Sequence, residues 1–307
     1  MEYLTVTQAA QKWGISPRRV RLLCAKGEIA GVTRKGNLYL ISASAEKPLD
    51  KRQLPHKKKR GQFAALFTAI DVKKAQLDMH RPLTAGEIQR LRDDFMVEFT
   101  YNSNAIEGNT LTLKETAMVL EGVTIDRKPL KDHLEAVGHR DAFLYIEEIA
   151  QGQQKLRESE IKAIHSLVLI DRPEDKGAYR RIPVTIAGAY TKPVPPYLIE
   201  PQIAALLETN EQRKKTMHPI ERIARFHLEF EGIHPFIDGN GRTGRLLLNL
   251  ELIRNGYPAV NVKFADRKRY YDAFDTYYRD GRADAMVMLI AGYVAERLDH
   301  YLALVKE

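Results

Sequence analysis

Cysteine and long apolar runs are what this sequence has least of. Its 307 residues include one cysteine, Cys24, and no apolar run reaches the roughly 18 residues that suggest a membrane-spanning helix. One thiol cannot form an internal disulfide, and its neighbours Leu22 and Leu23 favour a place in a core. The first five residues also lack the basic start and apolar stretch of a signal peptide. We therefore expect a cytoplasmic protein with no membrane partner.

Acidic residues are scarce in the first fifth of the chain. Residues 1–62 hold 14 Lys or Arg and 4 Asp or Glu, a net charge of +10. The whole chain has 48 basic and 40 acidic residues, so the other positions have 34 and 36, a net charge of −2. Basicity that is confined to one region indicates a separate module with an anionic partner.

Helix and turn signals divide residues 1–45 into four short elements. The expected elements are a helix from the N-cap Thr7 to Trp13, a helix from the N-cap Ser16 to near Gly27, and strands at 29–33 and 38–41 joined by a turn at 34–37. Two short helices around the Gly14 turn match a helix-turn-helix, and the strand pair is placed like a wing.

This order resembles the small winged helix-turn-helix domains of the MerR and excisionase type. The resemblance implies that the second helix enters the major groove of duplex DNA and that the wing touches its backbone. The implied DNA contacts are Arg18, Arg19, Arg21 and Lys35. A basic helix that docks a protein is the alternative. Residues 46–62, which include the run Lys57-Lys58-Lys59-Arg60, are expected to form a basic linker.

From residue 63 to 307 the sequence predicts a mainly α domain with one small β-hairpin. The hairpin is expected at 182–186, followed by Ala187-Gly188 and by the prolines of 193–196. The expected helices span 63–79, 86–104, 112–121, 132–151, 157–170, 199–214, 218–233, 243–255, 267–280 and 283–304.

The segment 232–245 is the most informative part of the sequence, because it joins two apolar helices. Pro235 ends the first helix. Gly239-Asn240-Gly241 can adopt positive φ and turn several N–H groups toward one anion, at the N-terminus of the second helix. A phosphate site is therefore expected here, built from Asp238, Gly239, Asn240, Gly241, Arg242, Thr243, Gly244 and Arg245.

Two further side chains add chemistry to this phosphate site. Asp238 is its one carboxylate, and a carboxylate beside phosphate oxygens usually needs a bridging Mg²⁺. His234 has a near-neutral pKa and can accept a proton from an incoming hydroxyl. Each feature alone is ordinary, but their joint occurrence between two apolar helices is improbable by chance.

The loop resembles the signature of the Fic (filamentation-induced-by-cyclic-AMP) family, His-x-Phe-x-(Asp/Glu)-Gly-Asn-Gly-Arg-x-x-Arg. All eight specified positions match, from His234 and Phe236 to Arg245. The resemblance implies a Fic-type helical domain in which His234 activates a hydroxyl, Phe236 anchors the loop, and Asp238 holds Mg²⁺ beside bound ATP. Relatives that transfer phosphate instead carry Lys at the position of Gly241, so glycine favours AMP transfer.

Two other segments resemble parts of the same family. Thr185, Ile186, Ala187 and Gly188 resemble the flap that docks a target protein by strand addition. Tyr270-Tyr271 resembles the pair that lines the adenine pocket, although Tyr278 stands where many relatives have a small polar residue.

Residues 103–109 resemble the inhibitory pattern (Ser/Thr)-x-x-x-Glu-(Gly/Asn) of that family. Ser103, Glu107 and Gly108 match it, near a helix expected at about 100–110. The resemblance implies that Glu107 pairs with Arg245, which then cannot hold the γ-phosphate.

The function that follows is a protein adenylyltransferase, a nucleotidyltransferase that moves AMP from ATP to a Ser, Thr or Tyr hydroxyl and is autoinhibited by Glu107. Two alternatives stay open: a protein de-adenylylase, and a DNA-bound regulator or toxin-type module with weak catalysis. The target protein, the DNA sequence and the formation of homo-oligomers stay open as well.

Overall fold

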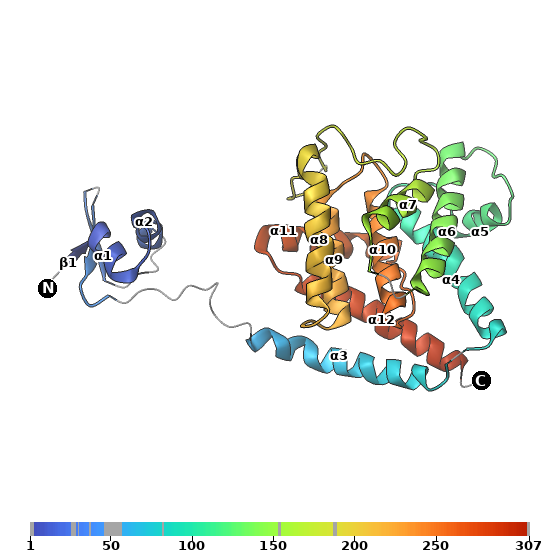
Figure 1. The fold of residues 1–307 in the computed structure, drawn as a ribbon, viewed down its shortest axis with the longest axis horizontal. Coiled ribbons are helices and arrows are strands. Elements are labelled where there is room, and N and C mark those ends of the chain that lie inside the picture. Colours follow the sequence, from blue (N-terminus) through green and yellow to red (C-terminus); the bar gives the residue numbers. More distant parts are fainter. Residues whose placement is uncertain are drawn as a thin grey trace. The chain divides into compact units, whose positions relative to one another are not determined.

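A computed structural model describes residues 3–25, 29, 31–36, 38–45, 57–81, 83–152, 155–186 and 189–305. The chain divides into two units, residues 1–62 and 63–307 (Figure 1). Each unit has its own hydrophobic core. No helix in these described stretches is long and apolar enough to cross a membrane.

The first unit packs two helices against a three-stranded antiparallel sheet. Its elements are β1 (Tyr3–Thr5), α1 (Val6–Trp13), α2 (Pro17–Ala25), β2 (Val32–Lys35) and β3 (Leu38–Ser42), with the strand order β1-β3-β2. Ala9, Val20 and Ile41 are fully buried between the helices and the sheet, and Cys24 is buried in the same core, as predicted.

Three boundaries in this unit differ from the prediction. Thr5, not Thr7, caps α1, because Gln8 completes a capping box with Thr5. The wing strand begins at Val32, and its turn is two residues long, since Gly36 has φ +58° and lets β2 and β3 pair up to the turn. Helix α3 begins at Lys57, inside the segment predicted as a linker.

The second unit is helical, and its helices lie within a few residues of the predicted ranges. They are α3 (Lys57–Asp78), α4 (Ala85–Ile106), α5 (Leu113–Leu120), α6 (Leu130–Ala150), α7 (Glu158–Val168), α8 (Ile199–Arg213), α9 (Pro219–Ile233), α10 (Asn240–Arg254), α11 (Arg267–Asp280) and α12 (Asp284–Leu304), with short 3₁₀ turns at Pro196–Leu198 and Phe264–Asp266.

Helices α9 and α10 are largely buried because they lie between two cores. One face of the pair packs against α3 and α12, and the other packs against α4, α6, α7 and α8. A buried ion pair between Arg222 of α9 and Glu251 of α10 also joins the two helices, at 2.5 Å. The loop between α9 and α10 is therefore held at both ends by elements that cannot shift independently (Figure 1).

The predicted β-hairpin at 182–186 is wrong: the described stretches 155–186 and 189–305 contain no strand. Four prolines between residues 183 and 196 lack the N–H that a strand ladder needs. Arg180 joins the two limbs of the segment instead, since its guanidinium donates to the carbonyl oxygens of Ile182 (3.1 Å) and Val194 (2.5 Å). Ala187 and Gly188, predicted in the flap, lie outside the described residues.

Candidate active site

The loop from His234 to Gly239 is braced by its own backbone and by one asparagine. His234 ends α9 in the left-handed region (φ 52°) and donates its N–H to the Phe230 carbonyl. Asn240 holds the loop closed: its Oδ1 accepts the Phe236 N–H and its Nδ2 donates to the Phe236 carbonyl, both at 2.9 Å. A positive φ at a non-glycine residue costs free energy, so its presence at His234 marks a conformation that the surroundings enforce.

Phe236 anchors the loop in the core by stacking on a histidine that the sequence analysis missed. The rings of Phe236 and His165 are 3.6 Å apart and nearly parallel. His165 Nδ1 accepts the Gly177 N–H at 2.9 Å, so the proton sits on Nε2, which donates to the Asp238 carbonyl at 3.0 Å. Burial lowers the pKa of His165 to about 4, which keeps this tautomer neutral.

Helix α10 begins at Asn240 rather than at residue 243, and this changes how an anion would be held. Of the three residues expected to supply positive φ, only Gly239 has it, at 73°. Asn240 and Gly241 are already helical, so the N–H groups that can face an anion are those of the first helical turn. Thr243 is fully buried in this helix.

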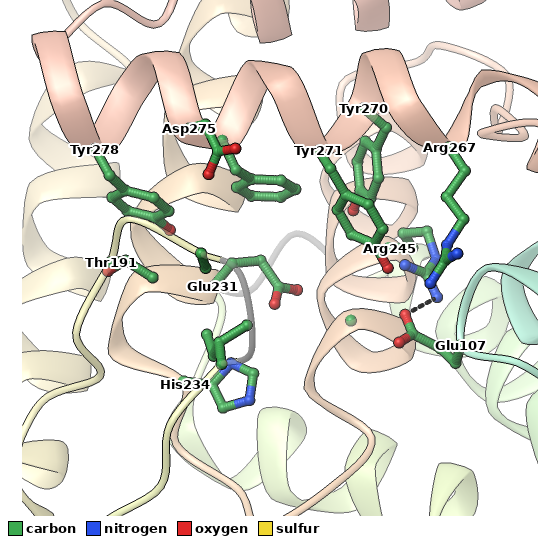
Figure 2. A pocket seen from close by; sticks show the side chains of 14 residues that line it. Glu107, Thr191, Glu231, His234, Arg245, Arg267, Tyr270, Tyr271, Asp275 and Tyr278 are labelled. Atoms are coloured by element: carbon green, nitrogen blue, oxygen red, sulfur yellow. Dashed lines mark hydrogen bonds and ion pairs between the residues drawn. The ribbon is translucent and has the colours of Figure 1, made fainter.

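A pocket of about 270 Å³ opens beside this helix end (Figure 2). In Figure 2, α11 runs along one side, the Glu107–Arg245 pair lies at one end and Tyr278 with Thr191 at the other. The lining residues are Glu107, Ile186, Ala189, Thr191, Glu231, His234, Gly241, Arg245, Arg267, Tyr270, Tyr271, Phe274, Asp275 and Tyr278. Of the predicted nucleotide-binding residues in the described stretches, Thr185, Asp238, Gly239, Asn240, Arg242, Thr243 and Gly244 are not part of this lining. Of the predicted regulatory residues, Glu107 lines the pocket, while Ser103 and Gly108 do not.

His234 has the protonation state that a proton acceptor needs. Burial lowers its pKa to about 4, so the imidazole is neutral at neutral pH. A hydrogen bond to the Glu231 backbone opposes this lowering of the pKa, and the Nδ1 atom is buried.

Arg245 is bound by both members of the predicted inhibitory pattern. Its Nε donates to Ser103 Oγ (2.9 Å), and its Nη2 donates to the Ser103 carbonyl (2.7 Å) and to Glu107 Oε1 (2.8 Å). Gly241 makes room for this arrangement, because a Cβ there would lie 2.3 Å from Glu107 Oε1. The Glu107 carboxylate thus lies directly over the first turn of α10, where an anion would otherwise bind.

The other arginine of the loop is held away from the pocket. Arg242 is buried, and it pairs with Glu135 of α6 at 3.0 Å and with Asp238 at 3.5 Å. Asp238 also faces Arg172 at 3.6 Å, and these cations hold the pKa of its carboxyl below the ordinary value against the opposite effect of burial. About one third of the Asp238 side chain is exposed.

The described residues contain no cluster of three or more carboxylate, histidine or cysteine groups that could hold a metal by themselves. Mg²⁺ is commonly bound by one or two carboxylates together with substrate phosphates and water. The partly exposed, ionised Asp238 in the loop before α10 fits that second mode.

The aromatic residues of α11 form one wall of the pocket. Tyr270 is buried, with its hydroxyl 2.6 Å from His227 Nε2, while Tyr271 is more open. Tyr278 donates its hydroxyl to the Leu228 carbonyl at 2.6 Å and lies flat against Gly232, where a Cβ would be only 2.9 Å from the ring. The position where many relatives have a small polar residue is here filled by a ring whose hydroxyl already has an acceptor.

Glu231 is the pocket residue that the sequence analysis missed most clearly. It lies one helical turn before His234, and its Oε1 is buried with no hydrogen-bond partner among the described residues. Burial raises the pKa of its carboxyl to about 8, with a further rise from Glu107 that Arg245 opposes. Glutamate in an apolar helix gave no signal in the sequence, since its orientation toward the pocket depends on how α9 packs.

Comparisons with known proteins agree with this architecture. A model of the Fic/DOC family matches residues 155–252. The chain is 30% identical to the protein adenylyltransferase Fic of Nematostella vectensis, across 95% of this chain and 70% of that protein. It is also 30% identical to the protein adenylyltransferase Fic of Drosophila yakuba, across 94% of this chain, and spans about 60% of the length of that relative.

A solved structure of a Fic-domain-containing signalling protein from Bacteroides thetaiotaomicron has the same fold. Its TM-score is 0.69 at 27% identity, and the match covers 78% of this chain and 97% of that one. With a matching loop, a matching helical frame and a relative of 30% identity that it largely covers, the chain belongs to the Fic/DOC family.

Proposed function

We propose that the chain is a protein adenylyltransferase, which transfers AMP from ATP to a Ser, Thr or Tyr hydroxyl of a target protein. The hydroxyl oxygen attacks the α-phosphorus of ATP and forms a new P–O bond. The bond from the α-phosphorus to the bridging oxygen breaks, and pyrophosphate leaves with its electron pair. The hydroxyl proton passes to His234, and the target keeps AMP in a phosphodiester linkage.

One observation carries the proposal: a neutral histidine, a helix N-terminus and an aromatic wall line the same pocket. His234 comes from the end of α9, Gly241 from the first turn of α10, and Tyr271 from α11. The helix N-terminus suits the phosphates of ATP and the aromatic wall suits its base. The relatives compared above are named protein adenylyltransferases. The pocket lies in the part of those proteins that this chain matches, which supports the same activity here.

Mg²⁺ would be held at Asp238, together with phosphate oxygens and water. When bound, the ion would offset the negative charge of the triphosphate. Arg242 orients Asp238 from one side, and Arg172 lies on the other. Ile186 and Thr191 bound the pocket on the side of the 182–194 segment, where we propose that the target protein docks.

Differently labelled ATP tests the proposal. The Glu107→Gly protein is incubated with Mg²⁺ and ATP labelled either at the α- or at the γ-phosphate, and labelled sites are identified by mass spectrometry. AMP transfer places the α label on protein and leaves the γ label in pyrophosphate. A protein that takes up the γ label is a kinase, and a protein that binds ATP but takes up neither label contradicts the proposal.

We further propose that Glu107 holds the wild-type enzyme in a low-activity state. Its carboxylate occupies Arg245 and repels a triphosphate that approaches the first turn of α10. Glu107→Gly is therefore expected to label more strongly than wild type, and a Glu107→Gly, Arg245→Ala double variant should lose that gain. Equal labelling of Glu107→Gly and wild type at equal ATP affinity would mean that Glu107 does not inhibit.

The same carboxylate favours a second candidate activity, removal of AMP from a modified protein. About one third of the Glu107 side chain is exposed, so it can hold a water molecule near the position of the α-phosphorus. De-adenylylation predicts that wild type releases AMP from a labelled target faster than Glu107→Gly does. Transfer without release leaves only the first activity.

For the first unit we propose duplex DNA as the partner, which would make the chain a DNA-bound regulator. Arg18, Arg19 and Arg21 of α2 line a surface hollow of about 580 Å³ beside Tyr39, and Lys35 lies in β2. Each lost phosphate contact should lower the log–log salt slope of binding by about 0.9. The test compares the full chain with an Arg18→Ala, Arg21→Ala variant and with Arg127→Ala, an exposed arginine of the second unit. A slope unchanged by the double variant favours a protein partner.

A further inference from the structure

The turn that carries Glu107 is placed by contacts outside its own helix. Helix α4 ends at Ile106, and the chain closes a turn in which the Asn109 N–H donates to the Asn104 carbonyl at 3.1 Å. Gly108 sits in this turn with φ +97°, and a Cβ there would touch nothing within 4 Å. The space around Gly108 is therefore open, and hydrogen bonds rather than packed side chains hold the turn in place.

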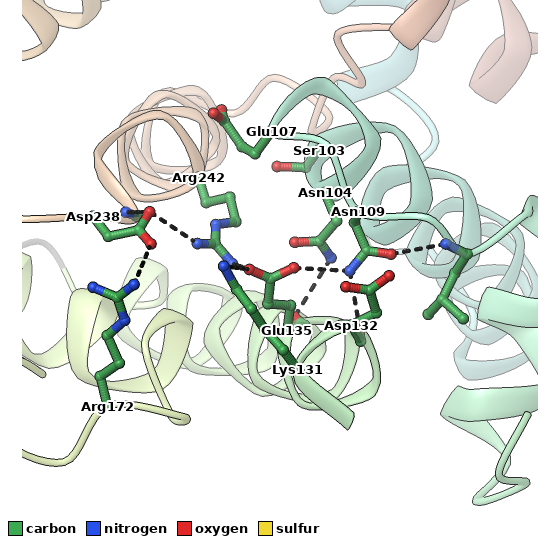
Figure 3. Close-up of polar contacts among 12 residues, drawn as sticks. Ser103, Asn104, Glu107, Asn109, Lys131, Asp132, Glu135, Arg172, Asp238 and Arg242 are labelled. Carbon is green, nitrogen blue, oxygen red and sulfur yellow. Dashed lines mark hydrogen bonds and ion pairs between the residues drawn. The ribbon is translucent and has the colours of Figure 1, made fainter. Parts of the chain in front are cut away.

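Two asparagines on either side of Glu107 attach the turn to α6. Asn109 Nδ2 donates to the Asp132 carbonyl (3.1 Å) and to Glu135 Oε2 (2.9 Å), and Asn104 Nδ2 donates to the Glu135 carbonyl at 3.4 Å. Figure 3 shows both amides reaching the same short stretch of α6. The stretch of chain that presents Glu107 to Arg245 is thus docked mainly on Glu135 and its neighbour Asp132.

The same carboxylate also binds the catalytic loop. Glu135 Oε1 pairs with Arg242 at 3.0 Å, and both side chains are buried, at 7% and 2% exposure. A buried carboxylate is stable only when its oxygens are paired. Loss of either Arg242 or Asn109 as a partner of Glu135 should therefore be unfavourable. One carboxylate therefore joins the turn that carries Glu107 to the first arginine of the loop (Figure 3).

We propose that Glu135 is a positioning residue for both states of the site: through Asn109 it places Glu107 opposite Arg245, and through Arg242 it places the catalytic loop. In the contact between Glu107 and Arg245 the guanidinium is buried and only the carboxylate is partly exposed, so the contact forms only where the turn brings Glu107 to Arg245. Glu135 and Asn109 hold the turn in that position. The inference rests on the adenylyl transfer and the inhibitory role of Glu107 proposed above.

Asn109→Ala separates the two positioning roles of Glu135. It removes the hydrogen bond that holds the turn with Glu107, and it leaves the ion pair of Glu135 with Arg242 intact. A hydrogen bond to a charged group has a large enough effect that we expect transfer to rise about five- to tenfold. In the Glu107→Gly background the same change should alter transfer by no more than about twofold, since no inhibitory carboxylate remains to be placed. Asn255→Ala is the matched control, because it removes an amide that donates to a carbonyl at the end of α10.

Glu135→Gln weakens both the contact with Asn109 and the ion pair with Arg242, so its effect should differ from that of Asn109→Ala. In the Glu107→Gly background it is expected to raise the KM for ATP, because Arg242 loses its ionised partner. Equal stimulation by Asn109→Ala with and without Glu107 would overturn the positioning role.

Amide hydrogen exchange tests the positioning role of Glu135 without an activity assay. Asn109→Ala and Glu135→Gln should each speed exchange about tenfold at Glu107 and Asn109, whose N–H groups close the turn. Exchange as slow as in wild type in both variants overturns the proposal. If the Glu107→Gly protein carries no AMP, the proposed function fails, while exchange still reports on Glu135.

Discussion

Two walls of the pocket, besides the aromatic wall of α11, are built in different ways. The wall from His234 to Arg245, the loop wall, is set by apolar helices on both sides, by Phe236 in the core and by the double contact of Asn240 with the Phe236 backbone. The opposite wall, the 182–194 segment, has no strand in its described residues and is tied to the loop wall by Arg180. Many weak contacts hold one wall, and a single buried guanidinium holds much of the other.

Arg180 makes this contrast concrete. Its backbone N–H donates to the Pro235 carbonyl and its Nε to the His234 carbonyl, while its other nitrogens reach Ile182 and Val194. The proposed catalytic histidine and the proposed docking segment therefore share Arg180 as a hydrogen-bond partner. Substitutions in the loop wall should therefore lower the rate of AMP transfer. Substitution of Arg180 should mainly weaken the binding of the target protein.

His234→Ala is expected to have the largest effect, and it tests the loop wall. Loss of a general base should lower transfer by about 10²–10⁴-fold, measured by α-labelled ATP in the Glu107→Gly background. The fold should persist, because Phe236 and Asn240 keep the loop closed. His80→Ala, at an exposed position after α3, is the control. Near-normal labelling by a folded His234→Ala protein would remove His234 from the mechanism.

Arg180→Lys tests the other wall. Lysine keeps the charge, but one ammonium cannot serve the carbonyls that the planar guanidinium reaches. We expect the KM for the target protein to rise about tenfold, with a smaller change in kcat and earlier proteolytic cleavage within 182–194. A loss confined to kcat would show that Arg180 acts on the loop wall alone.

Gly241→Ala should have a moderate effect of the opposite sign. Gly241 has ordinary helical geometry, so alanine adds no backbone strain, and its Cβ would displace the Glu107 carboxylate. Transfer is expected to rise several-fold in the wild-type background. In the Glu107→Gly background the gain should vanish. A loss there would show that residue 241 contacts the nucleotide closely.

The same contrast explains what the sequence could predict. The mainly helical fold and the Fic/DOC family are confirmed, because apolar periodicity and an eight-position motif depend on residues close together in the chain. The winged helix-turn-helix of the first unit stays a prediction. The hairpin was wrong, because Arg180 replaces a strand ladder through contacts distant in sequence. Glu231, His165 and Glu135 were missed for the same reason: only helix packing brings them to the loop.

The smallest expected effect is on the pH dependence of stability. Burial raises the pKa of Glu231 and lowers the pKa of His234. The folded chain holds a proton on Glu231 up to about pH 8, whereas an ordinary glutamate loses it near 4.5. Stability therefore falls as pH rises between these values. The buried His165, His227 and His234 have folded pKa values of about 4, 3 and 4, below the ordinary 6.5. They lower stability only as pH falls below 6.5.

Above pH 6.5, then, Glu231 is the group whose removal should flatten the stability profile. Wild type is expected to lose at most about 1.4 kcal/mol of unfolding free energy per pH unit between 6.5 and 8, less where pocket water screens the carboxylate. Glu231→Gln should show a flat profile in this window, measured by denaturant unfolding at fixed ionic strength. Glu208→Gln, on the exposed face of α8, should keep the wild-type slope. Parallel profiles for Glu231→Gln and wild type would mean that Glu231 is ionised throughout, and that Arg245 offsets its burial.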